Sequence, residues 1–210
     1  MGVRHRVTAL PRRLFRCRAS PGPGTIPESM MKFCPDCGQP VVQRIPPGDN
    51  LPRAVCTACG HIHYENPRIV VGCVPAWQGR ILLCRRAIMP RRGFWTTPAG
   101  FLENGESLQA AAARESLEEA EAQVQVGSLL TITHVLHAAQ VHVAFRAHLV
   151  DGRFGVGAES LESGLYEEGE IPWEDIAFPS ISFALRCYIE DRRTGVEPVH
   201  FFDIEHPLRG

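Results

Sequence analysis

The sequence predicts an α+β or mixed-sheet domain preceded by a small cysteine-rich module. Three observations support this prediction. Apolar runs from residue 69 onward have the length and β-branched content of strands. Two stretches, near 107–120 and 179–195, have helical periodicity. Four cysteines in two closely spaced pairs lie between residues 34 and 59.

Residues 1–30 differ in composition from the rest of the chain. They contain six arginines, the single acid Glu28 and the turn-prone run SPGPGTIP, without the apolar stretch of a secretory signal. We expect a disordered extension here, because the segment offers no apolar core. An organelle-targeting segment remains an alternative, as does an upstream mis-assigned start with Met30 or Met31 as the natural one.

Four cysteines have the spacing of a metal site. Cys34, Cys37, Cys56 and Cys59 form C-x2-C-x18-C-x2-C, and each pair is followed by a glycine suited to a tight turn. Two such turns supply four thiolates for a tetrahedral ion, so we expect one structural Zn²⁺ within residues 31–66. Two disulfides are the alternative, but the sequence shows no secretion signal. We interpret the nearby His61 and His63 as spectators.

The remaining elements follow in order along the chain. They are strands at 69–77 and 80–86, a helix at 107–120, strands at 124–136, 140–150 and 161–168, and a helix at 179–195. A turn at Gln78 and Gly79 joins the first two strands, and Ser180 is the candidate cap of the last helix. We expect residues 201–210 to be a tail.

Composition limits the classes of partner. With 210 residues and a formal net charge of −1, the chain has no overall attraction to nucleic acid or to an anionic membrane. No apolar run approaches the roughly 20 residues of a membrane-spanning helix. We therefore expect a cytoplasmic protein that binds neither nucleic acid nor a membrane, and a homodimer remains open.

Glutamates on the first predicted helix form the most unusual feature. At about 100° per residue, Glu115, Glu118 and Glu119 project as one cluster away from the apolar stripe of the helix. Clustered carboxylates suit hard divalent cations such as Mg²⁺ or Mn²⁺. Because like charges at this spacing repel, either bound cations or simple solvation must account for them.

The residues around this helix resemble a known signature. The run G-x5-E-x7-R-E-x2-E-E closely resembles the box of the Nudix hydrolases, and it consists of Gly100, Glu106, Arg114, Glu115, Glu118 and Glu119. This chain departs from the family pattern at Ser116, where an aliphatic residue is usual. It also departs at Glu121, where the family has glycine, and this puts the left-handed exit of the helix in doubt.

The resemblance implies a Nudix domain at 67–200, in which helices sandwich a mixed β-sheet, and it implies roles for these residues. Glu115, Glu118, Glu119 and the backbone carbonyl of Ala99 would bind Mg²⁺ or Mn²⁺. Glu106 and Arg114 would form a salt bridge that braces the loop against the helix. ESGLYEEGEIP resembles the late acidic element of the family and places Glu162 in the acid position, with Glu159 as the alternative. Glu118 or Glu162 would be the general base.

The resemblance also implies a reaction, the hydrolysis of a nucleoside diphosphate linked to another group. The span from MKFCPDCGQP to EIPWEDIAFPSI resembles the group associated with ADP-ribose and FAD pyrophosphatases, which release AMP and a phosphorylated product. NADH pyrophosphatase is the alternative. It is disfavoured because no SQPWPFPxS-like run follows the box, and AFPSI at 177–181 lies elsewhere. Phe94, Trp95 and Tyr166 would either stack on the substrate or lie in the core.

A different class of function stays open beside the enzyme. A zinc ribbon can bind nucleic acid or protein, and some Nudix domains act as ligand sensors without catalysis. Residues 32–68 contain only Lys32, Arg44, Arg53 and Arg68 as basic side chains, with no basic patch interleaved with aromatics. All the acids of the box are present. We therefore expect an enzyme with a small nucleotide substrate.

Overall fold

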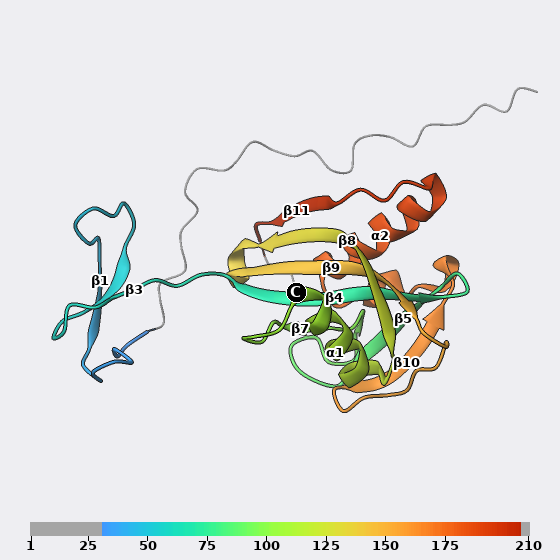
Figure 1. The fold of residues 1–210 in the computed structure, drawn as a ribbon, viewed down its shortest axis with the longest axis horizontal. Coiled ribbons are helices and arrows are strands. Elements are labelled where there is room, and N and C mark those ends of the chain that lie inside the picture. Colours follow the sequence, from blue (N-terminus) through green and yellow to red (C-terminus); the bar gives the residue numbers. More distant parts are fainter. Residues whose placement is uncertain (1–30, 207–210) are drawn as a thin grey trace, which may run out of the picture.

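The structure is a computed structural model that describes residues 31–206. The predicted extension at 1–30, which includes the alternative start at Met30, lies outside the described residues. Within them, a three-stranded sheet forms one end of the molecule and a larger α+β domain forms the rest (Figure 1). No helix in the described part is long and apolar enough to cross a membrane.

The N-terminal module is an antiparallel sheet in the order β1-β2-β3. Its strands are β1 (Val41–Arg44), β2 (Arg53–Cys56) and β3 (Ile62–His63). The turns that hold the cysteine pairs close at Gly38 and Gly60, which have φ of 71° and 74°. In each turn the glycine N–H donates to the carbonyl of the first cysteine of the pair. Glycine adopts this left-handed conformation at little cost, which confirms the turn prediction.

The larger domain contains an eight-stranded sheet. Its strands are β4 (Arg68–Trp77), β5 (Arg80–Arg86), β6 (Trp95–Thr96), β7 (Ala99–Phe101), β8 (Val124–Val135), β9 (Gln140–Leu149), β10 (Ser160–Tyr166) and β11 (His200–Ile204). The main order is β10-β5-β4-β9-β8-β11, with β6 paired to β5 and β7 paired to β4. The β4–β9 and β8–β11 pairs are parallel and the others are antiparallel, so the sheet is mixed as predicted.

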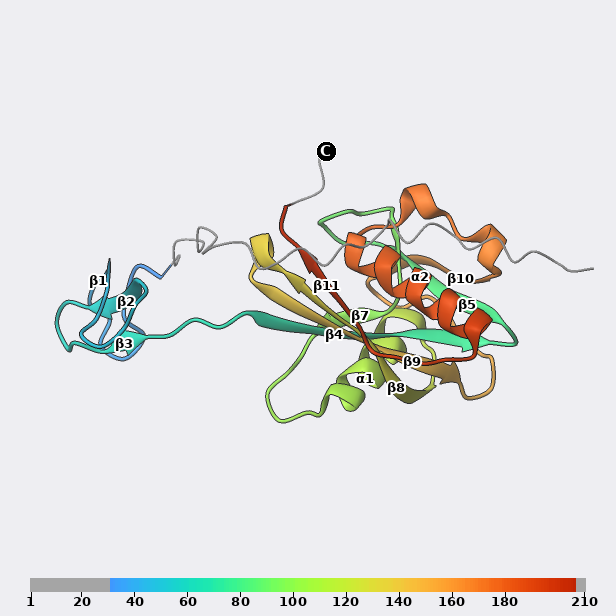
Figure 2. The ribbon, with the colours of Figure 1, turned by 90° about the horizontal axis from the view of Figure 1, so that it is seen from above.

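Two helices, α1 (Leu108–Ala120) and α2 (Pro179–Thr194), cover opposite faces of this sheet (Figure 2). Alternation along β4 explains the arrangement, because successive side chains of a strand point to opposite faces. Val71 and Cys73 pack in one cluster with alanines of α1, whereas Val74 and Ala76 pack in another with apolar residues of α2. The predicted sandwich of helices around a mixed sheet is therefore confirmed. Three 3₁₀ turns complete the elements: η1 (Leu136–Ala138), η2 (Glu168–Glu170) and η3 (Trp173–Asp175).

Two details of the C-terminal region differ from the prediction. Residues 201–204 belong to β11 rather than to a tail, since their strand pairs in parallel with β8 and Phe202 stacks on Phe183 of α2. Helix α2 has Phe178 at its N-cap and Pro179 in its first turn, so Ser180 lies inside the helix and is not the cap. Proline suits this position because the first-turn N–H groups have no partner within the helix.

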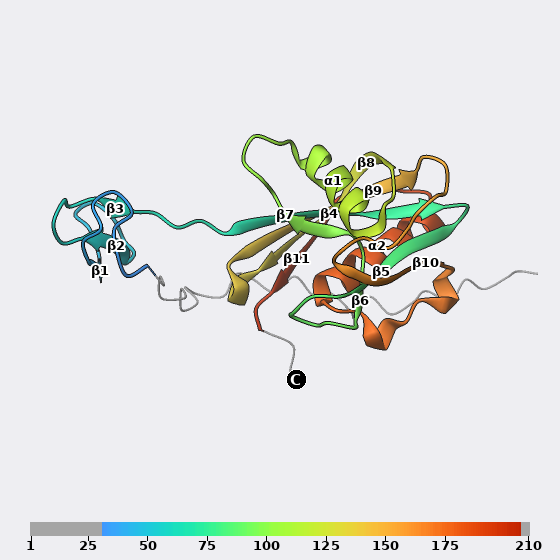
Figure 3. The same cartoon turned by 90° about the horizontal axis from the view of Figure 1, so that it is seen from below.

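An opening in the sheet positions the functional site. Strands β4 and β5 pair with each other only at Ala76–Ile81 and Trp77–Arg80, next to their connecting turn. Farther along, β4 pairs with β7, and β5 pairs with β6. Strand β7 leads into the loop before α1, and Figure 3 shows β7 and α1 side by side next to β4. Strands β4 and β5 thus separate where the N-terminal half of β4 lies beneath α1, the helix that carries the clustered glutamates.

Candidate active site and metal centres

Local sequence sets the limits of helix α1. Ser107 caps the N-terminus, where its hydroxyl accepts a hydrogen bond from the N–H of Ala110 at 3.2 Å. At the other end Glu121 has φ 49° and ψ 27°, and its N–H donates to the carbonyl of Leu117. The left-handed exit therefore exists although glutamate replaces the usual glycine. The departure at Glu121 therefore does not prevent the left-handed exit of the helix, because the closing hydrogen bond involves only the backbone.

Arg114 connects the loop before α1 to the acidic face of the helix. Its Nε and one terminal nitrogen donate to both oxygens of Glu106, at 3.1 and 2.7 Å. The other terminal nitrogen donates to Glu115 at 2.7 Å and to Glu118 at 3.1 Å. A bidentate guanidinium–carboxylate pair fixes both distance and orientation. Arg114 thereby holds Glu106 and two of the three clustered carboxylates in place.

Gly100 is required by the position of Glu115. A Cβ added at Gly100 would lie 2.2 Å from Oε1 of Glu115, closer than any real contact allows. The side chain of Glu115 therefore lies directly over strand β7, where any larger residue would displace it. This contact explains why a glycine and a glutamate fifteen residues apart belong to one motif.

Glu119, like Glu115, is a buried acid of the cluster. Its Oε2 accepts a hydrogen bond from the N–H of Ala99 at 3.2 Å, and the residue is 7% exposed. Burial raises the pKa of Glu119 from its ordinary 4.5 to about 7, despite the hydrogen bond from Ala99, and the nearby Glu115 adds to the rise. Burial also raises the pKa of Glu115. Both shifts reflect a site in which negative charge lacks sufficient compensation from the protein.

A cavity of about 990 Å³ opens beside these acids. Its walls come from strands β4, β7 and β9, the loop at 86–91, helix α1 and the N-terminus of α2. The box residues Ala99, Gly100, Glu115, Glu118 and Glu119 all line it, together with Glu159. This volume falls at the upper end of the usual range for small-molecule sites. The acidic cluster is therefore open to a ligand.

The structure does not bring Glu162 to this cavity. Glu162 lies in β10 opposite Arg85, with 3.5 Å between their charged atoms, and its side chain is 55% exposed. A register shift occurs between Ser160 and Glu162, and the next residue, Ser163, faces Cys84 in the core beneath α1. Since successive strand residues point to opposite faces, Glu162 faces away from α1. The assignment of Glu162 to the acid position therefore conflicts with its placement, whereas Glu159 lines the cavity.

The aromatic side chains considered for stacking lie elsewhere. Trp95 is buried in the α2 core and meets Tyr166 edge-to-face at 5.1 Å, and Phe94 packs against Arg91. Phe101 and Phe178 are the aromatic residues of the cavity instead, accompanied by Arg86 and Arg91. The arginines come from the run RRAIMPRR, and its dense positive charge is the sequence feature that could have indicated them.

The donor set at the acidic cluster suits a hard cation. Carboxylates and a backbone carbonyl are the ligands that Mg²⁺ and Mn²⁺ prefer. The oxygens of Glu115, Glu118 and Glu119 are not among the described groups whose ligand atoms all lie within 4.8 Å of one another. One ion could not contact all three acids as they are placed. Two or more ions could together contact the three acids, or a small movement of the exposed Glu118 would let one ion contact all three.

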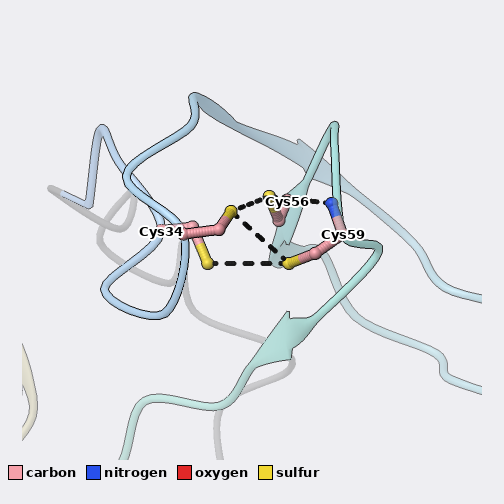
Figure 4. A group of neighbouring side chains, drawn as sticks. Cys34, Cys56 and Cys59 are labelled. Atoms are coloured by element: carbon pink, nitrogen blue, oxygen red, sulfur yellow. Dashed lines mark hydrogen bonds between the residues drawn. The ribbon is translucent and has the colours of Figure 1, made fainter.

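The four cysteines of the ribbon fit zinc closely. The sulfurs of Cys34 and Cys59 are 3.8 Å apart (Figure 4). The Cys37 sulfur lies 3.4 Å from that of Cys56 and 3.6 Å from that of Cys59. A zinc–sulfur bond of about 2.3 Å gives a tetrahedron with edges of about 3.8 Å, whereas a disulfide requires about 2.05 Å. All four are free cysteines. The N–H of Cys59 donates to the sulfur of Cys56 and lowers the pKa of that thiol to about 6.

The two ribbon histidines lie close to this cluster. His61 pairs with Asp36 at 2.8 Å and stacks on His63, whose ring nitrogen also lies near Cys34 and Asp36. The four sulfurs already complete a tetrahedral set, so neither histidine is needed as a ligand. The spectator interpretation remains a prediction.

The raised pKa of Glu119 predicts a pH-dependent stability in protein freed of divalent cations. The folded state holds this proton more tightly than the unfolded state, so its contribution to stability is lost as the pH rises from about 4.5 through 7. The loss should approach roughly 3 kcal/mol. Urea unfolding at pH 5 and pH 8 should show a larger loss in the wild type than in Glu119→Gln, in which the raised pKa of Glu115 remains. An identical pH dependence in both proteins would contradict the burial of a charged Glu119.

Fold and site together define a Nudix domain with an N-terminal cysteine ribbon, and comparison with known proteins supports this. The family model described as NUDIX domain matches residues 66–174, and the one described as Nudix N-terminal, a zinc ribbon, matches residues 32–65. The chain belongs to the Nudix family.

Two curated relatives are similar to most of the chain. An NAD-capped RNA hydrolase from Schizosaccharomyces pombe is 27% identical over 82% of this chain, and the NAD-capped RNA hydrolase NudC from Citrobacter koseri is 31% identical over 76%. The matched regions span only 46% and 59% of those proteins. A crystal structure of a Nudix hydrolase from Nitrosomonas europaea is 50% identical, with a TM-score of 0.81 over 84% of this chain and all of that one.

Proposed function

We propose that this protein is a pyrophosphatase that hydrolyses the diphosphate of an adenine dinucleotide and releases two mononucleotides. One observation carries the proposal: a partly buried carboxylate cluster, braced by Arg114, opens into a cavity of about 990 Å³. The cations that accompany a diphosphate would supply the positive charge that the cluster lacks, and the remaining volume would hold the two nucleosides.

The chain's own residues would divide the work. Glu115, Glu118 and Glu119 would hold Mg²⁺ or Mn²⁺, with the carbonyl of Ala99 as a further ligand. The ions would neutralise the diphosphate and lower the pKa of a bound water. Arg86 and Arg91 line the same cavity and would hold phosphate oxygens.

Glu159 is the better placed general base. Glu159 lines the cavity, and its carboxylate has no hydrogen bond or ion pair to another described side chain, whereas Glu118 is engaged by Arg114 at 3.1 Å. A carboxylate without a guanidinium partner has its oxygens available to accept a hydrogen bond from the attacking water. Glu159 would therefore accept the proton of the attacking water.

Relatives of this chain favour a nicotinamide dinucleotide over the ADP-ribose or FAD expected from sequence. The two curated relatives described above are named for hydrolysis of an NAD cap. The segment AFPS, which falls outside the expected position of the NADH-type element, lies on the cavity wall as Ala177 to Ser180. NADH therefore becomes the first candidate substrate, and ADP-ribose and FAD become the second.

A capped RNA is a candidate for the same reaction. The names of the relatives support it, as does the loop RRAIMPRR, which places Arg86 and Arg91 on the cavity and Arg85 and Arg92 beside them. The RNA phosphates that follow the cap would bind to positively charged side chains of this kind. This possibility modifies the expectation of no nucleic-acid partner.

A substrate panel tests the proposal. NADH, NAD, ADP-ribose, FAD, a short NAD-capped RNA and ATP would be supplied with Mg²⁺ or Mn²⁺, and the products separated by chromatography. We expect the highest kcat/KM for a nicotinamide dinucleotide or the capped RNA, with AMP or its RNA-linked form as product. A preference for ATP would overturn the assignment as a dinucleotide pyrophosphatase.

The placement of the late acids gives a paired prediction. Glu159→Gln should lower kcat by roughly 10²–10⁴-fold, the range expected for a lost general base. Glu162→Gln should leave kcat within about twofold, because an exposed ion pair with Arg85 contributes little. Steady-state kinetics on NADH would distinguish the two. A larger loss in Glu162→Gln than in Glu159→Gln would restore the original assignment.

A further inference from the structure

A small polar network interrupts the largely apolar wall of the cavity. Gln140 and His142 project from β9, and Ser180 lies in the first turn of α2. One ring nitrogen of His142 lies 3.0 Å from the hydroxyl of Ser180, and the other lies 2.9 Å from the amide oxygen of Gln140. Their neighbours on the wall include Val135, Ala138, Phe178, Pro179 and Ile204.

The network lies on the face of the sheet opposite to the acids. Val141 and Val143 of β9 pack toward α1, so His142 between them faces α2. The clustered acids Glu115, Glu118 and Glu119, which line the same cavity, belong to α1. A ligand whose diphosphate lies at the acids can therefore extend through the opening of the sheet toward this network.

Proton placement in the network leaves two groups for a ligand. Burial lowers the pKa of His142 to about 4, so the ring is neutral and has one donor and one acceptor nitrogen. If the ring donates to the Gln140 oxygen, it accepts from Ser180, and the cavity meets the Gln140 NH₂ as donor and the Ser180 oxygen as acceptor. If the ring is in its other tautomer, Gln140 turns over and both polarities reverse. Either arrangement offers one donor next to one acceptor.

Among the described residues these two groups have no other partner. The amide nitrogen of Gln140 makes no hydrogen bond, and the Ser180 hydroxyl bonds only to His142 although the residue is 4% exposed. A site built to hydrogen-bond its ligand discriminates strongly, because an analogue that lacks the matching group leaves these atoms unpaired.

We propose that Gln140, His142 and Ser180 recognise a planar group that carries a donor next to an acceptor, at one end of the dinucleotide. A primary carboxamide has this pattern, and so does the edge of adenine formed by its amino group and the adjacent ring nitrogen. The proposal rests on the proposed function, and it assigns substrate selection to residues outside the metal box.

Equilibrium binding to the full chain, without divalent cations, tests this independently of turnover. Calorimetry would compare nicotinamide mononucleotide with nicotinic acid mononucleotide, and AMP with purine riboside 5′-monophosphate, which has hydrogen in place of the amino group. Each second compound lacks the donor of the donor–acceptor edge. We expect Gln140→Met and Ser180→Ala to weaken binding of one amide or amino compound by about 3- to 10-fold, the effect of one hydrogen bond. Its analogue should bind equally to wild type and variants.

The affected compound identifies the group at the network. A loss confined to nicotinamide mononucleotide assigns the carboxamide, and a loss confined to AMP assigns adenine. His148→Gln changes an exposed histidine of β9 that lies outside the cavity and should alter neither affinity. Unchanged affinities in both variants, or an equal loss for a compound and its analogue, would overturn the proposal. Failure of the proposed function would appear instead as absence of hydrolysis in the substrate panel.

Discussion

Glu119→Gln should lower kcat with NADH by at least about 100-fold while the protein remains folded, because loss of a catalytic metal ligand costs several kcal/mol of transition-state stabilisation. Glutamine has nearly the same shape, and its amide oxygen can still accept the hydrogen bond from the N–H of Ala99. The change thus removes charge while keeping the packing. Steady-state kinetics across a range of Mg²⁺ concentrations would measure the effect.

Glu121→Gln is the matched control for this experiment. Glu121 follows α1 directly, is exposed and does not line the cavity. We expect its kcat to stay within about twofold of wild type, as for most surface substitutions. A normal rate in Glu119→Gln, or an equal loss in Glu121→Gln, would contradict the role of the α1 cluster.

Cys59→Ser should abolish the single zinc ion per chain and unfold the ribbon. Structural zinc sites contribute about 10–16 kcal/mol of apparent binding free energy in isolated zinc-finger peptides, and a hydroxyl replaces thiolate poorly as a ligand. Elemental analysis would give the zinc content, and circular dichroism with thermal unfolding would report the fold. We expect hydrolysis to change much less than stability, because the ribbon cysteines lie outside the cavity.

His61→Ala controls for disturbance of the same turn. His61 pairs with the exposed Asp36 and would be a spectator beside four sulfur ligands. Its zinc content should remain one per chain. A full zinc content in Cys59→Ser, or its loss in His61→Ala, would show that the ligand set differs from the four cysteines.

Local patterns predicted most of the fold. Strand β9 alternates apolar and polar side chains, and β4 is a nearly continuous apolar run. The cysteine pairs with their glycines determine their turns within a few residues. Strands β6, β7 and β11 were not predicted. Two of them have only two or three residues, and their positions depend on pairing with β5 and β4. Such elements result from tertiary contacts rather than from local periodicity.

Part of the candidate site could likewise be predicted from local sequence, and part could not. Gly100, Glu106, Arg114 and the α1 acids follow one another closely, so a sequence motif could define them. The late acid could not be located, because a register shift of one residue in β10 decides whether a side chain faces the cavity or the other side. Gln140, His142 and Ser180 come from separate elements, and only the folded chain brings them together.

The most direct test of the account is the release of products from NADH with Mg²⁺ and with EDTA. We predict equal amounts of AMP and reduced nicotinamide mononucleotide in Mg²⁺, none in EDTA, and recovery of the reaction when excess Mg²⁺ is added back. Release that persists in EDTA would contradict the role of the carboxylate cluster. No cleavage of NADH, ADP-ribose or FAD under any divalent cation would contradict the pyrophosphatase assignment itself.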